Sequence, residues 1–187
     1  MANSKFYATL YMKYDILILP DTYMIKGEDY MANYLLKPVF KSVFNRDFQS
    51  NKFEDRLEMQ KAVFLLQNMG ISVGDYKFMW YKHGPYSQTL QNDILAAQNI
   101  KDIKIEFSSD AKKEIDALRK AIFKDGLDYD VSQWIECLGS LQYIKENLLP
   151  SSVDNAALLK ELKKRKPHLN LDKDNEMALQ TLKELAI

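Results

Sequence analysis

The sequence predicts a mainly α-helical protein, a compact bundle of about six or seven helices with a small two-stranded β ribbon. Apolar residues recur at helical spacing through most of the chain after residue 28, and capping residues stand before several of these stretches. Only two short segments in the same part alternate with the period of a strand. With 187 residues, of which 47% are hydrophobic, the chain is long enough to bury a core in one domain.

The beginning of the chain differs from the rest. Residues 1–28 are less regularly patterned and are predicted to form an irregular N-terminal extension, followed by a single helical domain at residues 29–187. Within the extension, the apolar run in residues 14–21 predicts one short buried strand. We expect that strand to stop at Pro20, because proline cannot donate a hydrogen bond to a neighbouring strand.

Two helices are expected to open the domain. The first is predicted to begin near Glu28 and to be interrupted at Pro38, because a proline inside a helix removes a hydrogen bond and clashes with the preceding turn. The strongest helical pattern covers residues 52–69, where a wide apolar arc predicts a central helix in contact with several neighbours. Gly70 follows it, where a left-handed C-cap is expected.

The period then changes from that of a helix to that of a strand. Residues 76–82 place three aromatic side chains on one face, and a second alternation occupies residues 103–107. These two segments can pair as an antiparallel ribbon that flanks a helix at residues 87–98. This order of elements is compatible with a winged-helix-like arrangement but does not require one.

Four further helices complete the prediction, each with a recognisable start. Their expected caps or first residues are, in order, Ser108 or Ser109, Asp130 with Gln133 at capping-box spacing, Ser151, and Asp172 or Asp174. Pro150 and Pro167 are expected to end the second and the third of these helices.

Charge and cysteine content limit the environments in which the protein is expected. Lys and Arg together number 26, the same as Asp and Glu together, so no net charge attracts nucleic acid or an anionic membrane. The longest apolar run is far too short to span a bilayer, and the amino terminus lacks the build of a signal peptide. The single cysteine, Cys137, cannot form an internal disulfide and fits a reducing compartment. We therefore expect a cytoplasmic protein without membrane contact.

Few residues are suited to catalysis or metal binding. Two histidines and one cysteine cannot supply a Cys/His zinc site, and no phosphate loop or dinucleotide fingerprint is present. A carboxylate-bound ion at residues 125–130 stays open, although this segment lacks the distal glutamate of an EF-hand. Ser87 lies four residues after His83, but a helix N-cap is favoured over a nucleophile. The sequence thus predicts no catalytic residue, no cofactor and no metal.

One basic cluster offers an alternative binding surface for nucleic acid. Its residues are Lys160, Lys163, Lys164, Arg165 and Lys166. Such a run can neutralise phosphates, but cations at the carboxyl end of a helix also stabilise the helix dipole. At zero net charge the structural interpretation is favoured.

Two segments carry a resemblance to a known family. Residues 56–67 read Arg-Leu-Glu-Met-Gln-Lys-Ala-Val-Phe-Leu-Leu-Gln, and residues 78–90 read Phe-Met-Trp-Tyr-Lys-His-Gly-Pro-Tyr-Ser-Gln-Thr-Leu. Together with Asp93, they resemble the phage-associated SocA/GepA-type proteins, the Panacea antitoxin domain and their YwgA-like relatives. These proteins share a Leu-Gln-Lys helix, an aromatic strand, a Gly-Pro turn and a new helix. Members often carry proline where Gln88 stands, but the first position of a helix tolerates most residues.

The resemblance implies a compact, mostly helical protein of mobile elements and prophages, without a catalytic residue at these positions. Several relatives act by binding another protein, either neutralising a toxin or delivering a partner to a protease. We therefore expect a non-enzymatic protein-binding module, antitoxin-like or adaptor-like, whose partner is a toxin, a protease or another host or phage factor. The expected partner-binding residues are Trp80, Tyr81, His83, Gly84, Pro85, Tyr86 and Ser87.

Other interpretations of the same residues stay open at this point. The motif also has a purely structural explanation, in which Gly84 adopts an unusual dihedral angle, Pro85 adds rigidity and the aromatic residues belong to the core. The alternative function is a winged-helix-type transcriptional regulator that binds nucleic acid through the basic cluster or through the helix after Ser87. A third is an uncharacterised enzyme with dispersed acidic residues. Formation of a homodimer is left open.

Overall fold

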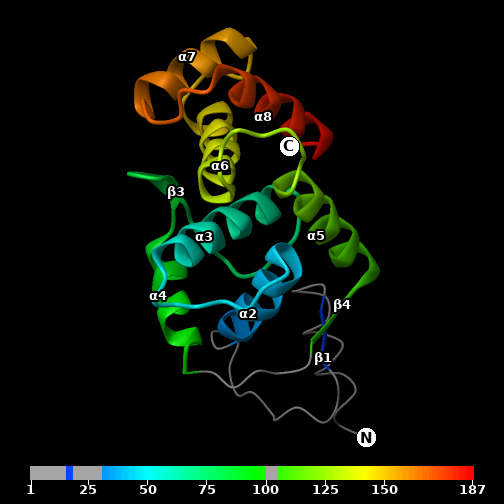
Figure 1. Cartoon of the computed structure of the whole chain (residues 1–187). Coiled ribbons are helices and arrows are strands. Elements are labelled where there is room, and N and C mark those ends of the chain that lie inside the picture. The colour runs from blue at the N-terminus through cyan, green and yellow to red at the C-terminus, as the bar shows by residue number, and fades with distance from the viewer. Residues whose placement is uncertain (1–15, 19–30, 100–104) are drawn as a thin grey trace, which may run out of the picture.

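The computed structural model describes residues 16–18, 31–99 and 105–187, which form seven helices and two antiparallel sheets of two strands each (Figure 1). In chain order the elements are β1 (Ile16–Ile18), α2 (Met31–Phe44), α3 (Phe53–Asn68), β2 (Met79–Tyr81), β3 (Gly84–Tyr86), α4 (Gln88–Ala97), β4 (Ile105–Phe107), α5 (Ser109–Ile122), α6 (Val131–Asn147), α7 (Asn155–Arg165) and α8 (Asp172–Glu184). The predicted fold class, a mainly helical bundle with a small β ribbon, is confirmed.

The strands pair differently from the prediction. β2 pairs with β3 in a tight hairpin, with Trp80 opposite Pro85, while β4 pairs with β1. The expected ribbon between residues 76–82 and 103–107 is therefore wrong, and the two segments that a winged-helix-like arrangement would join lie in separate sheets. A hairpin that closes over two residues costs less chain entropy than a pairing across the whole of α4.

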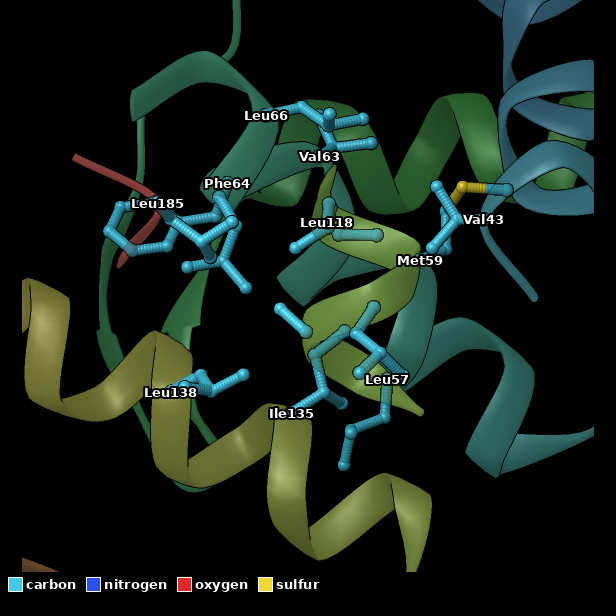
Figure 2. Close-up of a cluster of buried hydrophobic side chains, with 14 of the residues drawn as sticks. Val43, Leu57, Met59, Val63, Phe64, Leu66, Leu118, Ile135, Leu138 and Leu185 are labelled. Carbon is cyan, nitrogen blue, oxygen red and sulfur yellow. The ribbon is translucent and has the colours of Figure 1, made fainter. Parts of the chain in front are cut away.

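Helix α3 lies at the centre of the described fold, as its wide apolar arc predicts. It contacts α2, α4, α5 and α6, and also strand β3. Figure 2 shows part of the core around it, with labelled side chains from α2, α3, α5 and α6: Val43, Leu57, Met59, Val63, Phe64, Leu66, Leu118, Ile135 and Leu138. Gly70 follows α3 with a φ of +86°, so the predicted left-handed cap is confirmed.

The predicted interruption at Pro38 is wrong, because α2 continues through it to Phe44. An internal proline costs a helix about 3 kcal/mol. Burial of one large aliphatic or aromatic side chain contributes about 1.5–3 kcal/mol, and α2 buries several. The side chains of α2 that are at most 3% exposed are Leu35, Leu36, Val39, Phe40, Val43 and Phe44. Tertiary packing therefore outweighs the local cost of the proline.

Most helix starts agree with the sequence, and two do not. Ser108 caps α5, and Asp130 with Gln133 forms a complete capping box at α6. Helix α7 begins after the cap Asp154 rather than at Ser151. No side chain caps α8.

The carboxylate of Asp174, a predicted cap of α8, has a different role. It is fully buried and accepts hydrogen bonds from the backbone amides of Asp128 and Tyr129, at 2.8 and 2.7 Å. It therefore fastens the segment before α6 to α8.

The predicted N-terminal extension lies outside the described residues except for β1, which confirms a strand within residues 14–21. In the described parts of the chain, no helix is both long and apolar enough to cross a membrane. The upper part of Figure 1 shows α7 and α8 against α6, and the β2–β3 hairpin beside α6 and α3.

Candidate functional site

The β2–β3 hairpin is fixed by two polar side chains in the middle of helix α3. The Gln60 amide bonds twice to the backbone of Ser87: Nε2 donates to the Ser87 carbonyl and Oε1 accepts from the Ser87 amide, both at 2.9 Å. The Lys61 ammonium donates to the Pro85 carbonyl at 2.6 Å. The Gln-Lys pair of the helix and the Gly-Pro-Tyr-Ser segment, which the family resemblance combines, are thus in direct contact.

Gly84 allows the hairpin to approach helix α6 closely. Its φ is +82°, a left-handed conformation that side chains disfavour, and a Cβ at this position would lie only 2.5 Å from the Ser140 Oγ. The structural role expected for Gly84 is therefore confirmed: its backbone conformation favours glycine, and a side chain here would collide with Ser140.

Ser87 is the N-cap of α4, as the sequence favoured. Its hydroxyl accepts from the Leu90 amide at 3.4 Å, and the residue is 1% exposed. His83 is instead turned to another partner, since its Nδ1 lies 3.2 Å from Glu136 Oε2. Ser87 therefore has a structural role, because its hydroxyl caps a helix and His83 contacts Glu136 instead.

An ionic cluster with a buried centre, Glu136 of α6 and Lys166, lies next to the hairpin and includes the partly exposed His83 and His168. The Lys166 ammonium lies 3.1 Å from Glu136 Oε1, and His168 Nε2 lies 3.0 Å from the same oxygen. Lys166, which is 1% exposed, also donates to the backbone carbonyl of Lys82 at the hairpin turn. The segment after α7 is thereby joined to both α6 and the hairpin.

Burial shifts the ionisation of the groups under the hairpin. Loss of hydration lowers the pKa of Lys61 to about 7, with Glu136 opposing this shift and Lys166 adding to it. Burial disfavours the ionised form of Glu136 as well. Its pKa nevertheless lies below the usual value, because the nearby Lys166 and the two histidines stabilise the carboxylate.

A pocket of about 350 Å³ opens between the hairpin and the first half of α3. The residues that line it, called here the hairpin pocket, are Phe53, Arg56, Leu57, Gln60, Lys61, Tyr81, His83, Tyr86 and Gln91. Phe53 and Tyr81 are about half exposed, at 49% and 54%, although large aromatic side chains are usually covered. The lining contains lysine, arginine and histidine side chains but no carboxylate.

The seven predicted partner-binding residues occupy one hairpin but have different surroundings. Tyr81 is exposed, while Trp80, His83 and Tyr86 are half-buried. The remaining three, Gly84, Pro85 and Ser87, are buried, and so serve to shape the hairpin. Trp80 lies against Tyr143, with ring centroids 5.8 Å apart, and under the cations of Arg165 and Lys166 at 5.3 and 5.2 Å.

The alternative basic cluster is largely neutralised by nearby carboxylates. Lys163 pairs with Asp172 at 2.7 Å, and Glu161 pairs with both Lys164 and Arg165, at 3.6 and 2.5 Å. Lys166 is buried against Glu136, and Lys160 is exposed. Because most of these cations already pair with carboxylates, the cluster should attract phosphate less strongly than its number of charges suggests.

The residues of this site that sequence reasoning missed include Phe53, Arg56, Gln60, Lys61 and Glu136. A signal for two of them existed, because Gln60 and Lys61 interrupt the apolar stripe of the strongest helix at positions that must face the core. Nothing comparable distinguishes Phe53 or Arg56 from ordinary residues in the first turns of a helix.

The described residues contain no group of three or more His, Cys, Asp or Glu side chains arranged to hold a metal ion. Cys137 is buried, and burial raises the pKa of its thiol. Comparisons of the chain with family models, with curated proteins and with solved structures found no match.

Proposed function

We propose that this protein is a non-enzymatic protein-binding module of a bacterial or phage mobile element, antitoxin-like or adaptor-like, which inhibits or recruits its partner. The antitoxin-like or adaptor-like part of the proposal comes from the family resemblance. One observation supports a protein-binding surface: the exposed aromatic side chains of Phe53 and Tyr81 border a pocket whose frame is held by buried hydrogen bonds. Aromatic residues at such positions are the commonest energetic anchors of protein interfaces.

The rigid frame distinguishes this surface from a loop that carries aromatic residues by chance. The hairpin is bonded to α3 through Gln60 and Lys61 and to the segment after α7 through Lys166. Little ordering entropy is therefore lost when a partner binds. Met79, at 60% exposed, extends the apolar surface along β2.

The test is partner capture with matched variants. The wild-type protein, immobilised in a lysate of its host, should retain a specific protein, and Tyr81→Ala should weaken that complex by about 2 kcal/mol or more. The control is Phe123→Ala, because Phe123 is a comparably exposed aromatic (47%) at the end of α5. Equal losses for both variants, or no loss for Tyr81→Ala, would contradict the proposed surface.

A second variant tests the basic cluster. Changing Lys163, Lys164 and Arg165 together to Gln should leave partner binding unchanged, since these side chains already pair with carboxylates of the protein. If this variant stays folded but loses function, and the wild type shifts duplex DNA at physiological salt, a nucleic-acid-binding regulator replaces the proposal.

A further inference from the structure

We infer that the hairpin pocket binds the C-terminal residue of a partner polypeptide, with its apolar side chain against the aromatic walls and its free carboxylate at Lys61 and Arg56. This inference rests on the proposed function and specifies the group that the partner presents. It follows from three features of the pocket: its charge, its unused donors and its shape.

The charge of the lining is one-sided. Three lining residues are basic in type, namely Arg56, Lys61 and His83, and none is acidic. Glu136 is not among the lining residues, and its oxygens already contact His83, His168 and Lys166. An anionic ligand would therefore meet the Arg56 guanidinium and, below about pH 7, a protonated Lys61, without facing a carboxylate of the lining.

Donors remain for such a ligand. An ammonium has three N–H groups, and the one hydrogen bond described for Lys61 goes to the Pro85 carbonyl. Arg56 has five N–H groups, of which Nη1 donates to the Ser50 carbonyl at 2.7 Å. The Gln60 amide, by contrast, is engaged at both ends by Ser87. Lysine and arginine form charge-assisted hydrogen bonds with anionic acceptors such as carboxylates, and these are about twice as strong as neutral ones.

The shape favours a chain end over an internal acidic residue. The pocket, at about 350 Å³, is near the small end of the range for ligand pockets. Of its lining, Leu57, Gln60 and Lys61 are buried, whereas Phe53 and Tyr81 are about half exposed. An internal Asp or Glu brings two arms of chain and little apolar surface. A C-terminal residue carries a carboxylate and an apolar side chain on one Cα and enters with one arm.

The first experiment varies the ligand and leaves the protein unchanged. Three acetylated peptides of equal length are titrated into the full chain by calorimetry. The first ends in phenylalanine with a free carboxylate, the second is its C-terminal amide, and the third is an amide with an internal glutamate before the phenylalanine. The free acid should bind at least about tenfold more tightly than either amide, because only the free carboxylate can accept charge-assisted hydrogen bonds from Lys61 and Arg56. Equal affinity of acid and amide overturns the inference, and tight binding of the glutamate peptide overturns the assignment to a chain end.

The second experiment locates the carboxylate in the pocket. Lys61→Met should remove most of the preference for acid over amide, while Lys77→Met, which removes an exposed lysine outside the lining, should keep it. A thermal melt monitors folding of each variant. If Lys61→Met does not fold, Arg56→Met is used for the same comparison. A preference that survives in a folded Lys61→Met variant overturns the role given to this amine.

The pH profile gives a third measurement. Binding of a carboxylate favours protonated Lys61, so affinity for the free acid should fall as the pH rises above about 7, by at most tenfold per unit. The amide should show no such fall. The titratable and charged groups around Lys61 are Arg56 on α3, His83 and Tyr86 on the hairpin, Glu136 on α6, and Lys166 and His168 after α7. A His83→Gln variant should keep the fall, which separates the imidazole from the amine.

The outcomes distinguish this inference from the proposed function. If Tyr81→Ala still loses the captured partner but the acid peptide binds no more tightly than the amide, the proposed binding surface is supported and the recognition of a carboxylate is wrong. If the preference for the acid peptide comes with a dimer of the protein that Lys61→Met dissociates, the occupant is a second copy of this chain and the assignment to a partner is wrong.

Discussion

Helix α3 carries two sets of buried polar side chains, Asp55 with Glu58 and Gln60 with Lys61. The two sets differ in whether their charges are paired with an opposite charge. Near its beginning, Asp55 and Glu58 both pair with Arg46 from the segment after α2, the first at 2.8 Å. One turn later, Gln60 and Lys61 bond to the hairpin backbone, and Lys61 has no carboxylate among its hydrogen-bond partners. The first group is a closed structural contact, and the second lines an open pocket.

Each carboxylate of the first set, Asp55 and Glu58, has a further hydrogen-bond donor besides Arg46. Asp55 also accepts from the Gln49 amide at 2.7 Å, and Glu58 accepts from the Ser132 hydroxyl at 2.9 Å. The Arg46 guanidinium lies over the rings of Phe40 and Phe44, at 4.8 and 5.8 Å from their centroids. Burial nevertheless raises the pKa of Glu58, because desolvation outweighs its partners. A buried charged side chain thus points to a binding site only where some of its hydrogen-bond donors are unused and a cavity lies beside it.

The largest effect expected from a single substitution is the loss of the cation that pairs with the first set. Arg46→Met leaves two buried carboxylates unpaired, which costs about 3 kcal/mol of unfolding free energy, at the low end for buried pairs because Arg46 is partly exposed. Partner binding should stay unchanged at temperatures where the variant is folded. Urea denaturation measures the cost. The control is Lys41→Met, which breaks the exposed pair with Asp47 and should cost far less, because solvent screens exposed charges. Similar costs for both variants would contradict the distinction.

A smaller effect is expected where α3 holds the hairpin. Gln60→Leu removes the acceptor of the buried Ser87 amide, and an unsatisfied buried donor costs about 1–3 kcal/mol. The Ser87 carbonyl keeps its bond from the Gln91 amide in α4. Unlike Arg46→Met, this variant should also weaken partner binding, because the hairpin loses its support. Denaturation and capture of the partner are measured on the same sample, and a stability loss without a binding loss would show that the hairpin frame is not needed.

The charge of Lys61 should appear in the pH dependence of stability. Its pKa in the folded protein, about 7, lies below the value of 10.5 expected in the unfolded chain. Between these values the unfolded state binds more protons, so folding stability due to this group rises with pH, by at most about 1.4 kcal/mol per unit. The measurable quantity is the unfolding free energy of the wild type minus that of Lys61→Met between pH 7 and 10. A flat difference would mean that Lys61 is charged in the folded state throughout this range.

The sequence was sufficient for the elements that depend on local patterns. The stripe of α5, the capping box of α6 and the cap at Ser87 were all predicted, because each depends on residues within a few positions of one another. It was insufficient where distant parts meet. The pairing of β4 with β1, the continuation of α2 through Pro38 and the burial of Lys166 against Glu136 depend on contacts between separate elements.

The candidate site shows the same limit. The Gly-Pro-Tyr-Ser segment could be located from sequence, yet the pocket needs Phe53 and Arg56, which precede that segment by some thirty residues. Only Gln60 and Lys61 carried a signal, since charged or amide side chains rarely stand in the core face of a helix without partners. A polar residue inside an apolar stripe is therefore a useful pointer to what lies across the helix.

The smallest expected effect concerns the cap itself. The bond from the Leu90 amide to the Ser87 hydroxyl is long, at 3.4 Å, whereas the equivalent bond at Ser108 is 3.1 Å. Loss of an N-cap costs about 0.5–2 kcal/mol, so Ser87→Ala should lie near 0.5 kcal/mol and Ser108→Ala somewhat higher. Neither should change partner binding, because the Ser87 backbone, which Gln60 holds, is retained in alanine. A folded Ser87→Ala variant that loses all function would instead indicate a chemical role for the hydroxyl, and the assignment as a non-enzymatic binding module would be wrong.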